Sequence, residues 1–244
     1  MAPPPLILAS ASPQRRTLLA QLGRPFSVVP ASWNEPSADE RAAMRPRAWA
    51  MALAHAKARS VADQLVQDAR SAASPGALPV EVVGADTIVV CLGQVLGKPR
   101  DADDAGRMLR LQAGRVCEVI TGVCLLRVES VATSLRPSPN DVKNPAMCSP
   151  DAECFSVCRP DADDATKAQI VARRIAADIT RVHMRDDESA IEEYLRSGEW
   201  RDKAGAYGIQ GPADALIDRI DGSYSNVVGL PIELLVRMMK RDAG

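Results

Sequence analysis

Three long runs of apolar and β-branched residues constrain the fold of this chain more than any other feature. The stretch "VEVVGADTIVVCLGQVLGKPR" (80–100) carries two such runs with Gly93 between them, which is the pattern of a β-hairpin. The runs "VCEVITGVCLLRV" (116–128) and "ARRIAADITRVHM" (172–184) predict further strands, the second as one long strand or a pair. We therefore expect these strands to pair with one another in a β-sheet.

Segments of helical composition separate these runs. Residues 46–70 are rich in alanine and charged side chains, and residues 102–112 follow Asp101, which can cap a helix. Residues 186–200 and 231–239 predict two later helices. Strands and helices mix without strict alternation, so we expect an α/β fold with a mixed, twisted sheet flanked by helices.

The segment "LILASASPQRRTLL" (6–19) passes from an apolar strand to a polar turn and a helix within a few residues. Pro13 suits the first position of a helix, and Ser12 before it is a natural N-cap. Hydroxyls, free N–H groups and the guanidinium groups of Arg15 and Arg16 then meet at a helix N-terminus, which favours an anion such as phosphate. The alternative is that both arginines are solvated and Ser12 only caps the helix.

Charge and composition exclude several classes of protein. The chain has 244 residues, with 30 basic and 31 acidic side chains and a formal net charge of −1. We therefore expect no broad electrostatic surface for nucleic acid or for an anionic membrane, and no apolar stretch is long enough to span a bilayer. The six cysteines lack a CxxC pair and the start of the chain lacks a basic signal region, so we expect free thiols and a cytoplasmic protein.

Residues 129–165 differ from the rest of the chain. They are rich in Ser, Pro, Asn and Asp, hold three of the cysteines and show weak periodicity. We expect an irregular insertion or a partly disordered segment there.

A few polar residues interrupt the apolar runs and indicate chemistry. Asp86 stands in "GADTIVV" with Thr87 beside it, and a carboxylate in such a strand needs a pair, a hydrogen bond or a metal, unless it only caps a turn. Lys98 follows the predicted hairpin and is expected to reach the same place. Lys203 lies among small residues that let a backbone approach a ligand, and the amide of Gln210 could pair with a base.

These motifs, taken in order, resemble those of the Maf-like nucleotide pyrophosphatases, also called septum formation inhibitor proteins. The matching stretches are "LILASASPQRR", "GADTIVV", "LGKPRDADDAGRML", "VITGV", "YLRSGEWRDKAGAYGIQG" and "GSYSNVVGLPIELL". The resemblance implies one Maf-like domain over residues 1–244, with the insertion at about 129–165. It also implies two lobes around a cleft, in a fold similar to that of inosine triphosphate pyrophosphatases.

The resemblance assigns roles to single positions of this chain. It implies that Asp86 is the catalytic base and, together with Glu35, a ligand of Mg²⁺ or Mn²⁺. Within the family, "GADT" and "AGAYGIQG" are similar to the branch that acts on dTTP and UTP, which implies that Thr87 and Gln210 are the positions associated with base choice. Gln14 stands where that branch commonly has arginine. The positions expected to bind substrate are Ser10, Ser12, Gln14, Arg15, Lys57, Thr87, Lys98, Lys203 and Gln210.

The implied reaction is hydrolysis of dTTP or UTP to the monophosphate and pyrophosphate, a house-cleaning role that extends to modified nucleotides. The partners expected are the nucleoside triphosphate and, from the family, a second copy of the chain in a homodimer. The alternative function is a non-catalytic nucleotide-binding regulator of cell division, which would use the same cleft. A buried base such as Asp86 favours the enzyme, because binding alone does not need one.

Overall fold

The computed structural model describes residues 3–32, 44–71, 78–131, 155–156 and 167–240. A mixed sheet forms its centre, with strand order β2-β1-β3-β5-β7-β6, while β4 pairs with β3 and β8 pairs with β7. The strands are β1 (Leu6–Leu8), β2 (Phe26–Val28), β3 (Val80–Cys91), β4 (Gln94–Leu96), β5 (Val116–Val131), β6 (Phe155–Ser156), β7 (Lys167–Met184) and β8 (Ile217–Asp221). The expected α/β fold with a mixed sheet is confirmed.

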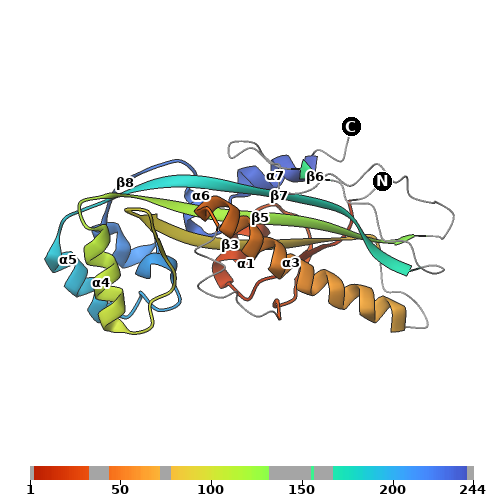
Figure 1. The fold of residues 1–244 in the computed structure, drawn as a ribbon, viewed down its shortest axis with the longest axis horizontal. Helices are drawn as coiled ribbons and strands as arrows, with labels where there is room; N and C mark the ends of the chain where they lie inside the picture. The colour runs from red at the N-terminus through yellow and green to blue at the C-terminus, as the bar shows by residue number, and fades with distance from the viewer. Residues whose placement is uncertain (1–2, 33–43, 72–77, 132–154, 157–166, 241–244) are drawn as a thin grey trace.

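The three longest strands are neighbours, and Figure 1 shows them running side by side through the molecule. β5 is antiparallel to both of its neighbours, β3 and β7, whereas β1 is parallel to both β2 and β3. The helices are α1 (Pro13–Ala20), α3 (Pro46–Ser71), α4 (Ala102–Gln112), α5 (Glu188–Ser197), α6 (Tyr224–Val228) and α7 (Ile232–Lys240). Two short 3₁₀ turns span Ala204–Ala206 and Gly211–Ala215.

Most predicted ends of elements lie within a few residues of the observed ones. Ser12 caps α1 and Asp101 caps α4, each through a side-chain oxygen that accepts a backbone N–H. Gly198 ends α5 in the left-handed conformation, and Gly93 lies in the β3–β4 turn with φ +75°.

The sequence predicts an irregular insertion from about residue 129 to 165. In the structure, residues 129–131 still belong to β5. Residues 155 and 156 form β6 against β7. The remainder of that segment, with three of the cysteines, lies outside the described residues. The other three cysteines, Cys91, Cys117 and Cys124, are buried free thiols.

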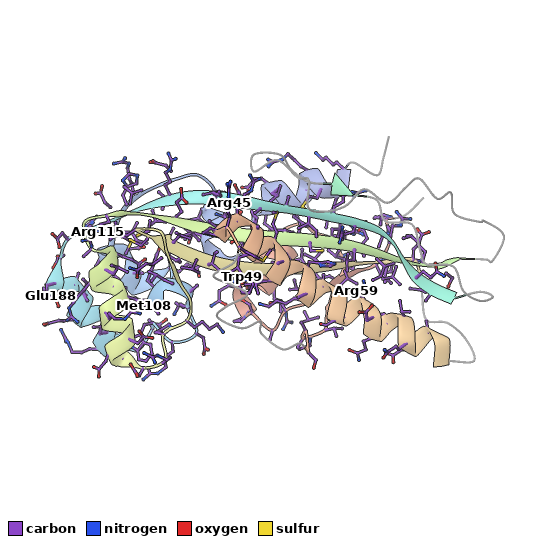
Figure 2. The ribbon with its side chains drawn as sticks, viewed as in Figure 1. Arg45, Trp49, Arg59, Met108, Arg115 and Glu188 are labelled. Atoms are coloured by element: carbon purple, nitrogen blue, oxygen red, sulfur yellow. The ribbon has the colours of Figure 1, made fainter. Side chains whose placement is uncertain are left out.

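The long helix α3 covers one face of the sheet at very close range. A Cβ atom added to Gly84 would lie 2.3 Å from the carbonyl oxygen of Ala54, and one added to Gly122 would lie 2.2 Å from that of Ala50. Two glycines therefore bring the helix backbone against β3 and β5. Beside them Trp49, labelled in Figure 2, packs in a cluster with Ile88 and Ile120.

Three further groups of apolar residues complete the core, and in one of them Ala58 and Val61 of α3 pack with Val82 and Leu126. α1 and α7 cover the opposite face, where Leu19 and Leu235 pack with Val83 and Val123. At one end of the long strands α4 and α5 lie together (Figure 1), and the core there includes Met108, labelled in Figure 2. Among the described helices, none has the length and apolar composition to cross a membrane.

Candidate active site

The edge of β3 has a gap between two neighbouring strands. β1 pairs with residues 81–83 of β3 and β4 pairs with residues 89–91, while β5 takes the other edge along residues 80–90. Over residues 84–88, β5 is thus the neighbour of β3 within the described sheet. Asp86 and Thr87 lie in this gap, next to the point where β1 ends and the chain enters α1.

Asp86 faces α3, because side chains alternate along a strand and Gly84 lies under that helix. Its Oδ1 forms an ion pair with the ammonium group of Lys57 on α3. The side chains of Asp86 and Lys57 are 16% and 19% exposed. A partly buried carboxylate gains from such a partner, and the pair explains why the sequence tolerates an acid in an apolar strand.

Arg15 reaches β3 from the first turn of α1 and is held by three hydrogen bonds. Its Nε donates to the carbonyl oxygen of Gly229 at 2.8 Å, and its terminal nitrogens donate to Ser10 Oγ at 3.3 Å and Thr87 Oγ1 at 3.2 Å. Burial lowers the pKa of the Arg15 guanidinium below its usual value, and the nearby carboxylate of Asp86 opposes that shift. Arginine stays a cation at neutral pH, so the gap holds two cations and one carboxylate.

The turn before α1 is held by its own serines. Ser12 Oγ accepts the N–H of Arg15 at 3.4 Å and donates to Gln14 Oε1 at 3.0 Å, and the N–H of Ser12 donates to Ser10 Oγ at 3.2 Å. Ser10 is buried, whereas Gln14 and Arg16 are exposed. Of the two arginines considered for an anion, the structure therefore turns Arg15 toward Thr87, the residue next to Asp86 on β3.

Three other predicted site residues have different surroundings. Lys98 is 65% exposed and pairs with Asp202 at 3.6 Å. Lys203 pairs with Glu199 at 2.9 Å and lies against Gly208, while Gln210 is exposed at the start of a 3₁₀ turn. The expectation that Lys98 reaches Asp86 is not met in this structure, because the chain after the hairpin carries its side chain toward Asp202.

Of the two acidic residues predicted to bind a metal ion, only Asp86 lies within the described residues. Glu35 lies outside them, and no cluster of three or more His, Cys, Asp and Glu side chains occurs in the part of the chain that the structure describes. Asp86 uses Oδ1 for Lys57, which leaves its second oxygen for another partner. A single carboxylate together with substrate phosphates is a common way for proteins to bind Mg²⁺, so the donor set fits this ion.

Sequence reasoning missed Thr121 on β5 and Asn226 on α6, which lie on the inner side of Thr87. Thr121 on β5 lies opposite Thr87, with the two hydroxyl oxygens 2.9 Å apart, and Thr121 donates to the carbonyl oxygen of Asn226 at 2.9 Å. Gly229 receives the bond from Arg15 described above. Thr121 in "VITGV" is a polar residue in an apolar run, the same signal that identified Asp86, and it could have been found that way.

Comparison with known proteins agrees with the motif order. The model of a family described as "Maf-like protein" matches residues 5–144 and 155–242. The chain is 37% identical to a dTTP/UTP pyrophosphatase of Koribacter versatilis, covering 97% of this chain and 93% of that protein. It is 36% identical to the dTTP/UTP pyrophosphatase of Deinococcus radiodurans (99% and 94%) and 34% identical to that of Thermococcus kodakarensis (96% and 94%).

Proposed function

Because the chain belongs to the Maf-like protein family, we propose that it is a nucleoside triphosphate pyrophosphatase that hydrolyses dTTP and UTP to the monophosphate and pyrophosphate. The observation that carries this proposal is the gap in the edge of β3, where Asp86 pairs with Lys57 and the guanidinium of Arg15 binds the neighbouring Thr87, near enough to Asp86 to be affected by its charge. The relatives at this identity are named as enzymes, which favours catalysis over the alternative of a non-catalytic regulator of cell division.

In this proposal a water molecule attacks the α-phosphorus and Asp86 accepts a proton from it. The water oxygen bonds to phosphorus, the bond from that phosphorus to the bridging oxygen breaks, and pyrophosphate leaves with the bonding electrons. Arg15 has two N–H groups beyond its three internal bonds, and these would bind phosphate oxygens as charge increases on them. The ion pair with Lys57 would hold the carboxylate of Asp86 in place beside the water.

A divalent cation, Mg²⁺ or Mn²⁺, would be held by Asp86 and Glu35 together with the phosphates. When bound, it would neutralise phosphate charge and make the phosphorus more open to attack. Both cations are hard acids that prefer carboxylate oxygens, which is the chemistry that Asp86 offers.

The remaining predicted residues have supporting roles in this proposal. Ser10 and Ser12 shape the turn that presents the backbone N–H groups of α1, and Gln14 lies at its rim. Lys98 would bind phosphate after leaving its exposed partner Asp202, which costs little in water. Lys203 would first give up its bonds to the carboxylate and the carbonyl oxygen of Glu199. The exposed amide of Gln210 offers a donor and an acceptor for the edge of uracil or thymine.

We also propose a cellular compartment and an oligomeric state. Cytoplasm suits the buried free thiols of Cys91, Cys117 and Cys124, because such thiols persist in a reducing compartment. A homodimer stays a prediction from the family, and measurement of the mass in solution by light scattering checks it.

The central test is Asp86→Asn, assayed for pyrophosphate release from UTP with Mg²⁺ and with Mn²⁺. We expect turnover to fall at least about 100-fold, since a positioned base contributes about 10²–10⁴-fold. Asp63→Asn, which removes an exposed carboxylate from the same helix as Lys57, is the matched control and should keep wild-type turnover. A variant at Asp86 that retains a tenth of the turnover would show that this carboxylate is not the base.

Substrate choice is tested by kcat/KM for UTP, dTTP, CTP and GTP. We expect UTP and dTTP first, CTP weaker and GTP poorest, because a site built to pair an amide with a base rejects mispaired analogues. A higher kcat/KM for GTP than for UTP would contradict the assignment to the branch that acts on dTTP and UTP.

A further inference from the structure

A line of hydrogen bonds joins Arg15 to the interior of the sheet. It runs from Arg15 to Thr87 Oγ1 at 3.2 Å, from Thr87 to Thr121 Oγ1 at 2.9 Å, and from Thr121 to the carbonyl oxygen of Asn226 at 2.9 Å. We propose that Thr121 is a positioning residue that holds Arg15 through Thr87, and that Thr87 serves this arginine rather than the choice of base. The substrate named in this inference rests on the proposed function.

The directions of these bonds follow from counting protons. A carbonyl oxygen only accepts, so Thr121 gives its single hydroxyl proton to Asn226. Thr87 must then donate to Thr121, and its oxygen accepts from Arg15. Every hydroxyl proton of the line points away from Arg15 and into the protein.

This direction limits what Thr87 can offer a nucleotide base. Its one proton is given to Thr121 and one of its lone pairs faces Arg15. A Cβ atom on Gly229 would lie 3.3 Å from Thr87 Oγ1, so the end of α6 packs close to the same hydroxyl. A hydroxyl bound in this way is suited to fixing the guanidinium, which is needed for every triphosphate alike.

The inner end of the line is rigid. Thr121 and Asn226 are both fully buried. The side-chain amide of Asn226 donates to the carbonyl oxygen of Val119 at 2.9 Å and to Thr180 Oγ1 at 3.0 Å, which ties α6 to β5 and β7. Thr121 cannot touch a substrate from this position, so any effect it has on binding must pass through Thr87.

The test compares Thr121→Val with Thr121→Ser. Valine keeps the shape and removes the hydroxyl, and serine restores the hydroxyl. The probe is inorganic tripolyphosphate, which has no base, bound to the full chain and measured by calorimetry below the unfolding temperature. We expect Thr121→Val to weaken tripolyphosphate at least about fivefold, to raise the KM for UTP by a similar factor and to leave the ratio of UTP to GTP unchanged. Thr121→Ser should bind tripolyphosphate within twofold of the wild type.

Thr180→Val is the matched control for loss of a buried hydroxyl. Thr180 is as buried as Thr121 and donates to the carbonyl oxygen of Ser223 at 3.0 Å; within the described residues its side chain accepts a bond from the side chain of Asn226 but has no hydrogen bond to Thr121, Thr87 or Arg15. We expect a similar fall in Tm and a tripolyphosphate affinity within twofold of the wild type. Equal losses of affinity in Thr180→Val and Thr121→Val would mean that general destabilisation is the cause, and the inference would fail.

Thr87→Val separates positioning from base choice. Positioning predicts equal losses for tripolyphosphate and UTP, whereas a role in reading the base predicts a changed order among UTP, CTP and GTP with unchanged tripolyphosphate affinity. The second result would overturn the inference. A wild-type chain that binds tripolyphosphate but cleaves no nucleotide would refute the proposed function alone, and one that binds no tripolyphosphate would refute this inference.

Discussion

Arg15 and Arg16 are neighbours in the sequence with opposite surroundings, and this contrast gives a prediction at the scale of single residues. Arg15 makes three hydrogen bonds inside the protein, while Arg16 is exposed. We expect Arg15→Ala to weaken UTP binding by about 1.5–3 kcal/mol, the value of a charge-assisted hydrogen bond. Calorimetry measures it, and Arg16→Ala should stay within about 0.5 kcal/mol of the wild type. Equal affinities for the two variants would show that Arg15 does not bind the phosphates.

Asp104 in the first turn of α4 gives a prediction on pH. Its buried carboxylate accepts from Arg107 at 2.8 and 3.0 Å and from Arg100 at 3.3 Å, and these bonds, that of Arg107 foremost, hold its pKa below the usual range. A depressed pKa stabilises the fold above the unfolded value of about 3.9, and the effect is lost as the pH falls through the folded pKa. We expect Asp104→Asn to lower the free energy of unfolding by about 1–3 kcal/mol at pH 7.

Urea unfolding between pH 3 and pH 7 checks this, with Asp103→Asn as the control because Asp103 is exposed in the same turn. The difference between wild type and Asp104→Asn should narrow below about pH 4. A constant difference over the whole range would mean that the charge of Asp104 is not what stabilises α4.

At the scale of elements, signals from residues close in sequence predict the ends of helices and the turns. Contacts between distant segments cannot be predicted in this way. The Ser12 cap, the Gly93 turn and the end of α5 depend on residues a few positions apart, so the sequence shows them directly. The bond from Arg15 to Gly229 joins residues more than 200 positions apart, and no local pattern indicates it. The hairpin by itself predicts Lys98 near Asp86, but the segment that brings Asp202 to Lys98 is more than 100 residues further along the chain.

The contact between α3 and the sheet predicts the effect of one added methyl group. A Cβ atom at Gly122 would lie 2.2 Å from the carbonyl oxygen of Ala50 and 2.6 Å from the amide nitrogen of Met51, so Gly122→Ala must push α3 outward. We expect a loss of about 1–3 kcal/mol in the free energy of unfolding. Turnover of UTP should fall as well, because α3 carries Lys57.

Chemical denaturation and the UTP assay test this together. Gly97→Ala is the control for stability, since nothing lies within 4 Å of an added Cβ atom there. A Gly122→Ala protein as stable as the wild type would contradict the close packing of α3.

At the scale of the whole molecule, the site and the segment after β5 lie at different places along the same strand. Thr121, opposite Thr87, is ten residues from the last residue of β5, and ten residues of strand span about 33 Å. The last register pair of β5 and β7 joins residues 131 and 167, so the two strands end side by side. A short turn can therefore connect them directly, as in an ordinary β-hairpin.

We expect a chain in which Asn-Gly replaces residues 132–166 to fold and to hydrolyse UTP with a kcat/KM within about threefold of the wild type. Asn-Gly forms the two-residue turn that matches the twist of paired strands, and a shorter loop lowers the entropy cost of closure by about 2 kcal/mol. The replacement removes β6, whose described pairing is with Arg173 and Arg174 on β7. Thermal unfolding and the UTP assay measure the outcome. Loss of cooperative unfolding would show that the replaced segment is part of the core, whereas cooperative unfolding without activity would show that it contributes to the site.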